Sequence, residues 1–254
     1  MDDVLEQVER ATAAVGDALA RTDLDAPSEL PGWSRLTVAC HLRFGAETLL
    51  RMTDDALAGR PASYYPGGRH RQRPGTLVSR PGETPAAVVE SLLQASAALH
   101  HRWRAVTDWS LEVREPADNP DLGTVPLRRL LLSRLTEVEV HGTDLGVGLG
   151  PWSDVLVRHA LPMRLEWLDA RRSNHRAVDE SMRRRWLLVA TDVPVRQLVE
   201  VDGPLLRSTP VAADATPEVD DTVTGTGAEL LALLLGRAPA PFAPADFNRA
   251  LPGP

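Results

Sequence analysis

A chain of 254 residues is long enough for one large domain or two small ones with apolar cores. It carries 28 basic and 35 acidic side chains, a net charge of −7 and no basic cluster, which argues against nucleic-acid binding. It has one cysteine and no internal disulfide, its longest apolar run is far too short to cross a membrane, and its acidic start is unlike a secretion signal, so we expect a cytoplasmic protein.

Apolar residues recur at helical spacing through the first two thirds of the chain. Ser34 and the pair Thr84–Pro85 are typical helix starts, because a hydroxyl can cap free backbone N–H groups and proline fits the first turn. We predict helices over residues 2–21, 35–58, 85–106, 126–146 and 152–171. The stretch 59–83 is rich in proline and glycine, so we expect a long loop there, and such loops often carry function.

The pattern changes after about residue 180, where short runs of β-branched and apolar residues replace the helical spacing. These runs predict strands over 186–191, 198–201 and 221–225, followed by a helix over 227–235. The last sixteen residues are rich in proline and alanine, and we expect no regular structure for them. We therefore predict a helical bundle over 1–175 and a small α+β domain over 180–254.

Two of the predicted helices carry residues typical of metal sites. His41 lies on the expected inward face of helix 35–58. Glu137 and His141 are four residues apart in helix 126–146, which places them on one face, one turn apart. If the two helices pack side by side, His41 completes a set of three ligands with one coordination position left open. That is the layout of a catalytic zinc site.

The neighbours of this pair favour the metal interpretation. Arg134, Glu137, His141 and Asp144 run along the edge of an apolar stripe at helical spacing. Buried polar side chains need partners, so Asp144 could orient the histidine and Arg134 could hold the glutamate around a metal. The alternative is an exposed helix face on which these side chains form ordinary ion pairs.

The remaining reactive residue types have simpler interpretations. Cys40 adjoins His41, but adjacent helix positions point in different directions, so we expect a small buried residue. Solvated surface is the expectation for five histidines, namely His70, His100, His101, His159 and His175. All 28 basic residues are arginine, which excludes Schiff-base chemistry on a lysine and is typical of GC-rich actinobacterial genes.

Four motifs, spread in order along nearly the whole chain, resemble those of one known family. They are Leu30–Ser34 followed by His41, Tyr65–Arg69, Glu137–Gly146 and Thr224–Arg237. The chain is similar here to the mycothiol-dependent maleylpyruvate isomerase family, whose members have a DinB-like four-helix bundle and a small C-terminal α+β domain. The resemblance therefore implies a fold that is mainly α with a small α+β part.

The same resemblance implies a site. His41, Glu137 and His141 would bind zinc, and the thiol of mycothiol would take the open position. Arg69 and Arg237 would be catalytic and would bind the cofactor and the anionic substrate, which suits arginine because its fork pairs with carboxylates. The implied reaction is cis–trans isomerisation of maleylpyruvate, or of a similar unsaturated keto acid, by thiolate addition, rotation and elimination.

Members of the family differ in substrate, so two alternatives stay open. One is a metal-dependent mycothiol S-transferase that acts on another electrophile, and the other is a non-catalytic metal- or ligand-binding protein. Hydrolysis ranks last, because the sequence has no His-Glu-x-x-His and Glu137 is already assigned as a ligand. As partners we expect a small anionic substrate and a low-molecular-weight thiol, with no nucleic acid and no membrane, and we expect a monomer or weak dimer.

Overall fold

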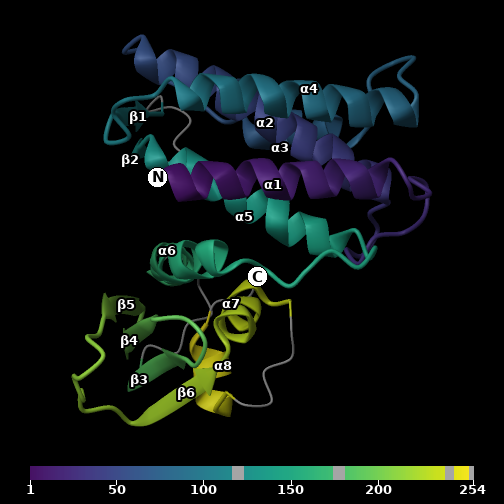
Figure 1. Cartoon of the computed structure of the whole chain (residues 1–254). Coiled ribbons are helices and arrows are strands. Elements are labelled where there is room, and N and C mark those ends of the chain that lie inside the picture. Colours follow the sequence, from purple (N-terminus) through teal and green to yellow (C-terminus); the bar gives the residue numbers. More distant parts are fainter. Residues whose placement is uncertain (116–122, 174–180, 238–242, 252–254) are drawn as a thin grey trace. The chain divides into compact units, whose positions relative to one another are not determined.

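The computed structural model describes all residues except 116–122, 174–180, 238–242 and 252–254 (Figure 1). By its internal contacts the chain divides into two compact units, Met1–Gly150 (unit 1) and Pro151–Pro254 (unit 2). Unit 1 is dominated by long helices, and unit 2 combines helices with a sheet. The predicted fold class, a four-helix bundle followed by a small α+β part, is therefore confirmed.

Four long helices form the bundle of unit 1 in the described part of the chain. They are α1 (Asp2–Leu19), α2 (Arg35–Leu57), α4 (Pro85–Arg104) and α5 (Arg128–Asp144). Helices α1 and α2 each pack against both α4 and α5 (Figure 1). This arrangement brings α2 alongside α5, and these are the helices that carry the predicted metal ligands.

The predicted helix starts are formed by the expected caps. The Ser34 side chain accepts a hydrogen bond from the Thr37 backbone N–H at 3.2 Å, which begins α2. The Thr84 side chain accepts one from the Ala87 N–H at 3.2 Å, and Pro85 occupies the first position of α4. Because the start of α2 is fixed in this way, the position of His41 along the helix follows directly from the sequence.

The stretch 59–83 is only partly a loop. It contains the short helix α3 (Arg69–Gln72) and the 3₁₀ turn η1 (Arg73–Leu77). Gly68 precedes them at φ 86°, a left-handed conformation that glycine adopts without steric cost, and the chain turns there into the helical segment. A short antiparallel pair that we did not predict, β1 (Glu112–Arg114) and β2 (Thr124–Pro126), completes unit 1.

Unit 2 contains a four-stranded sheet in the order β5–β4–β3–β6. The strands are β3 (Arg183–Ala190), β4 (Arg196–Asp202), β5 (Leu205–Pro210) and β6 (Asp221–Gly225). Strand β4 pairs antiparallel with β3 and β5, and β6 pairs parallel with β3. Three of these strands were predicted; β5, of which only one residue in six is buried, was not.

Three helices accompany the sheet, α6 (Asp154–Ser173), α7 (Gly227–Leu235) and α8 (Ala245–Ala250). Helix α7 begins with a reciprocal cap between Thr226 and Glu229 and ends at Gly236. Helix α8 lies in the proline- and alanine-rich tail for which we expected no regular structure. It forms because Phe247 is buried against the ring of Trp186 at a centroid distance of 5.3 Å.

The predicted domain boundary, between residues 175 and 180, lies outside the described residues. Helix α6, which precedes it, contacts α7 and β5, so the compact units divide at Gly150–Pro151. None of the helices in the described part of the chain combines the length and the apolar composition that a membrane crossing requires.

Candidate metal centre and cavity

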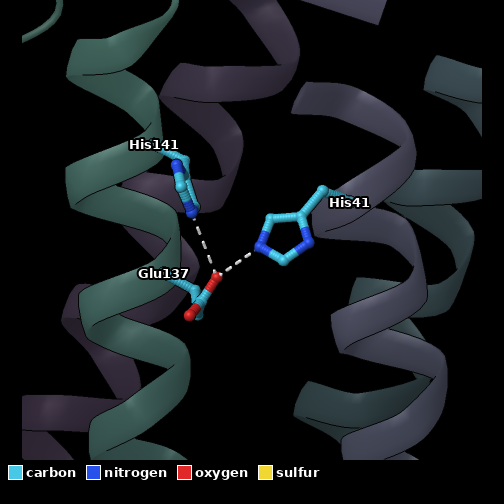
Figure 2. A group of neighbouring side chains, drawn as sticks. All are labelled: His41, Glu137 and His141. Atoms are coloured by element: carbon cyan, nitrogen blue, oxygen red, sulfur yellow. Dashed lines mark hydrogen bonds and ion pairs between the residues drawn. The ribbon is translucent and has the colours of Figure 1, made fainter. Parts of the chain in front are cut away.

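His41 on α2 and Glu137 and His141 on α5 point toward one another between the two helices (Figure 2). His41 Nε2 lies 2.8 Å from Glu137 Oε2, and His141 Nε2 lies 3.4 Å from the same oxygen. One ligand atom from each of the three residues lies within 4.8 Å of the others. The geometry that the sequence suggested is therefore present, with both imidazoles directed at one carboxylate.

Both imidazole rings are held by neighbouring side chains. His141 Nδ1 lies 2.7 Å from Asp144 Oδ2, which orients the ring and leaves Nε2 for the cluster, as expected for Asp144. The Trp33 ring stacks on His141 at a centroid distance of 6.2 Å and meets His41 edge-on at 5.5 Å. The ligand atoms are thus set in position by contacts outside the cluster.

Opposite charges dominate the ionisation of the cluster. Burial by itself would raise the pKa of the Glu137 carboxyl, but hydrogen bonds with His141 and His41 hold that pKa well below its usual range. Burial would lower the pKa of His141, but the carboxylates of Asp144 and Glu137 outweigh it and raise the pKa to about 9. The cluster therefore contains an ionised carboxylate whose charge attracts cations.

The donor set fits a divalent metal ion. Two imidazole nitrogens and one carboxylate oxygen are common zinc ligands, and a carboxylate behind a ligating histidine is a usual support. His41 Nδ1 is buried without a hydrogen-bond partner among the described residues, so Nε2, on the cluster side, is the atom through which this ring makes polar contact. His41, Glu137 and His141 are accordingly the residues that could hold zinc.

The cluster lines a cavity of about 390 Å³ within unit 1. The other charged residues that line this cavity are three arginines, Arg69, Arg73 and Arg134. Three guanidinium groups and one carboxylate thus line the cavity, which favours negatively charged ligands.

Arg69 and Arg73 lie on consecutive helical segments, α3 and η1, four residues apart. Within the described chain, neither guanidinium forms an ion pair with a carboxylate. The Arg73 guanidinium stands 5.8 Å from the centroid of the Trp33 ring, the same ring that packs on both histidines. Arg69 thus lines the cavity that it was expected to serve, and both arginines keep their hydrogen-bonding capacity for a ligand.

Arg134 does not hold Glu137 in the way that we expected. Its Nη1 donates to the Leu42 carbonyl at 2.8 Å and its Nη2 donates to Ser96 Oγ at 3.0 Å. The side chain is buried, and burial lowers its pKa to about 10, so it remains charged at neutral pH. Arg134 therefore contributes a fixed positive charge beside the cluster without a direct bond to it.

Arg237, the second predicted catalytic residue, lies in unit 2 directly after α7 and is exposed. Gly236 adopts φ 67°, which ends the helix, and the Arg237 backbone N–H donates to the Ala232 carbonyl at 2.9 Å. These contacts explain the backbone position of Arg237 at the end of α7. The role of its side chain stays a prediction.

One expectation about the other histidines is wrong. His100 is only 9% exposed, because α4 turns it into the bundle, and burial together with Arg134 lowers its pKa to about 4. His175 lies outside the described residues.

Sequence reasoning also missed Arg73 and Tyr64 as lining residues of the cavity. Arg73 lies four residues after Arg69, a spacing that places two residues on the same face of a helix. We did not use this spacing to predict Arg73, because we expected a loop in that segment.

Comparisons with known proteins identify the family and the fold. Residues 5–146 match the family model described as mycothiol maleylpyruvate isomerase N-terminal domain. Two solved structures are similar in fold, a mycothiol-dependent maleylpyruvate isomerase and a variant of it with one histidine replaced by alanine. Each has 22% sequence identity and a TM-score of 0.65, and the match covers 93% of this chain and 89% of the other. No curated protein sequence matches significantly.

The match to the family model covers more than half of the chain. The chain therefore belongs to the family that carries the mycothiol maleylpyruvate isomerase N-terminal domain.

Proposed function

We propose that this chain is a zinc-assisted, mycothiol-dependent isomerase that acts on maleylpyruvate or a similar unsaturated keto acid. The observation that carries the proposal is the cluster of His41, Glu137 and His141 in a cavity that Arg69 and Arg73 also line. Membership of the family supports mycothiol as the thiol.

The three clustered residues would hold the metal, and the cavity would hold the thiol and the substrate. A metal ion bound there would lower the pKa of a thiol at its open position, so that the sulfur reacts as a thiolate near neutral pH. A thiolate supplies reversible addition to a carbon–carbon double bond, which becomes, for the lifetime of the adduct, a single bond that can rotate. Asp144 and Trp33 would keep both imidazoles oriented throughout, since they already fix the rings.

The arginines would bind the substrate. A divalent metal with one glutamate ligand retains a charge of about +1, which a thiolate cancels, so a dianionic substrate gains little attraction from the metal itself. Arg69 and Arg73 have no carboxylate partner in the described chain and would each pair with a carboxylate of the ligand. On the sequence resemblance we assign Arg237 to the same reaction, as a further cation for the substrate or for the charge that develops on its keto oxygen.

The direct test is an assay with zinc-loaded protein. Maleylpyruvate is incubated with the protein in the presence and absence of mycothiol, and the ultraviolet spectrum is followed. We expect conversion to the trans isomer only when both protein and mycothiol are present. No spectral change with both present would contradict the proposed reaction.

The same cluster and cavity also suit a mycothiol S-transferase, because an activated thiol can add to other electrophiles without being expelled. Mass spectrometry of the reaction mixture separates the two reactions: a transferase leaves mycothiol covalently attached to the product, whereas an isomerase returns it unchanged. A protein that binds zinc and the thiol but converts no substrate would instead support the non-catalytic alternative.

A further inference from the structure

Gly45, in the middle of α2, leaves a gap between two hydrogen-bond donors. A Cβ atom added to Gly45 would lie 3.3 Å from Arg134 Nη1 and 3.4 Å from the Tyr64 hydroxyl oxygen. Gly45, Tyr64 and Arg134 all line the cavity of the metal-site cluster. The space that any other side chain would fill is therefore open to the cavity, with both donor atoms at its edge.

The Tyr64 hydroxyl has no hydrogen-bond partner among the described residues. Its ring is held by Phe44 and Tyr65, at centroid distances of 5.7 Å and 5.0 Å, so the orientation of the hydroxyl does not depend on a bond of its own. Burial raises the pKa of this phenol, and the group therefore keeps its proton at neutral pH. Tyr64 is a fixed donor whose acceptor is absent from the described chain.

Arg134 supplies the second donor. Nη1 carries two hydrogens, and the Leu42 carbonyl uses one of them. The bond from Nη2 to Ser96 holds the guanidinium plane. The group is buried and forms no ion pair with a carboxylate of the described residues, an arrangement that is costly unless a negative charge compensates it.

We propose that the gap beside Gly45 is an anion subsite in which one oxygen of a carboxylate or enolate accepts hydrogen bonds from Tyr64 and Arg134. This inference rests on the proposed function, because it assigns chemistry to the same cavity. Both donors are held in place by the fold before a ligand arrives, so they stabilise negative charge without reorganising. Gly45 is required because a methyl group on its Cα would crowd the oxygen out of the space between the two donors.

The test measures binding of maleate, a stable cis dicarboxylate, to the zinc-loaded full-length protein by calorimetry. Gly45→Ala fills the gap, and Tyr64→Phe removes one donor while keeping the ring. Each should weaken maleate binding by about tenfold or more, as expected when a hydrogen bond to a charged group is lost. Zinc content should not change in either variant. Because Tyr64→Phe keeps the ring contacts and adds no atoms, it separates the loss of the donor from the crowding of Arg134 and Tyr64 by the new methyl group of Gly45→Ala.

Two matched controls accompany these variants. Gly75→Ala adds a methyl group where nothing lies within 4 Å of the added Cβ. Tyr65→Phe removes a hydroxyl that already interacts with Thr76. Both should bind maleate within about twofold of the wild type, because neither alters the gap.

Wild-type protein that does not bind maleate, or Gly45→Ala and Tyr64→Phe variants that bind it as tightly as the wild type, would overturn the subsite. This readout does not depend on turnover. If the variants lose maleate affinity but the wild type does not convert maleylpyruvate, the proposed function fails and the subsite stands. If maleylpyruvate is converted but the variants bind maleate normally, the subsite alone fails.

Discussion

Asp144 allows the metal-site proposal to be tested without removing a ligand. Its carboxylate lies 2.7 Å from His141 Nδ1 and sets the ring so that Nε2 points at the cluster. Asp144→Asn keeps the shape but loses the negative charge, and we expect zinc affinity to fall by about 10- to 100-fold. Competition with a chromophoric chelator measures the change. Asp17→Asn, an exposed site on α1, is the control, and equal affinities of both variants and the wild type would contradict this role of Asp144.

Of the three arginines in the segment 69–77, Arg69 and Arg73 line the cavity and Arg71 does not. Arg69→Ala and Arg73→Ala should each lower turnover by about a hundredfold, as the loss of a donor to developing charge does, with zinc content unchanged. Arg71→Ala is the matched control, and it should leave turnover unaltered. If Arg69→Ala or Arg73→Ala keeps wild-type kcat/KM on a verified substrate, that arginine does not bind the reacting molecule.

His100 gives the bundle a dependence on pH. The charged groups that act on it are Arg134 on α5, Glu9 on α1 and Arg104 on α4, and burial is the largest cause of its low pKa. Because the pKa is about 4 in the fold and 6.5 in the unfolded chain, His100 is favoured in its neutral form. Its contribution to stability, about 3 kcal/mol at most, is complete above pH 6.5 and is lost as the pH falls toward 4.

Urea unfolding near neutral pH and near pH 4.5 tests this prediction. The wild type should lose stability between the two conditions, and His100→Gln should lose markedly less, because glutamine does not titrate. His101→Gln, an exposed neighbour, controls for the substitution itself. The same loss of stability in wild type and His100→Gln would show that other groups govern the acid sensitivity.

At the scale of secondary structure, the long helices could be predicted because local signals define them. Ser34, Thr84 and Gly236 are caps whose chemistry is visible in the sequence, and the structure uses all three. The short elements β1, β2 and β5 could not be predicted, since each depends on a partner strand or on burial that tertiary packing decides.

Some residues of the cavity are placed by local sequence signals, and others are placed by contacts between distant parts of the chain. The spacing of Glu137 and His141 and the face of α2 that carries His41 follow from helical periodicity. The placement of Tyr64 and Arg73 depends on how the segment between α2 and α4 is anchored. Arg51 donates to the Ser63 carbonyl at 2.7 Å, a contact that has no signature in the local sequence.

The other end of that segment is anchored by a buried ion pair. Arg43 Nη1 lies 2.7 Å from both carboxylate oxygens of Glu83, and the Arg43 side chain is only 4% exposed. Glu83→Ala would leave a buried charge without its partner, and we expect it to lower the free energy of unfolding by about 3 kcal/mol. It should also weaken maleate binding, because it frees the segment that carries Arg69 and Arg73.

Glu90→Ala, at an exposed site on α4, is the control and should change neither the free energy of unfolding nor the affinity for maleate. Chemical denaturation and calorimetry measure both, and a Glu83→Ala variant as stable as Glu90→Ala would refute the anchoring role.

At the scale of the whole chain, the proposed reaction draws on residues of both compact units. All three cluster residues, Arg69, Arg73 and the cavity belong to unit 1, whereas Arg237 belongs to unit 2. The family model likewise matches residues 5–146, almost the full extent of unit 1. Metal binding should therefore be a property of unit 1 by itself, and turnover should require the entire chain if Arg237 takes part.

A fragment ending at Gly150 separates these two properties. It retains the four long helices, their mutual contacts and every residue of the cluster, so it should bind zinc with an affinity close to that of the full chain. It lacks Arg237, and we expect no measurable isomerisation of maleylpyruvate with zinc and mycothiol supplied.

Full-length Arg237→Ala distinguishes the loss of this side chain from the loss of the whole unit. This variant should reduce turnover by about a hundredfold with normal zinc content. Arg249→Ala, on α8, is the control for a charge change in unit 2. Full-rate turnover by Arg237→Ala would remove Arg237 from the reaction, and full-rate turnover by the fragment would in addition leave unit 1 as the complete catalytic unit.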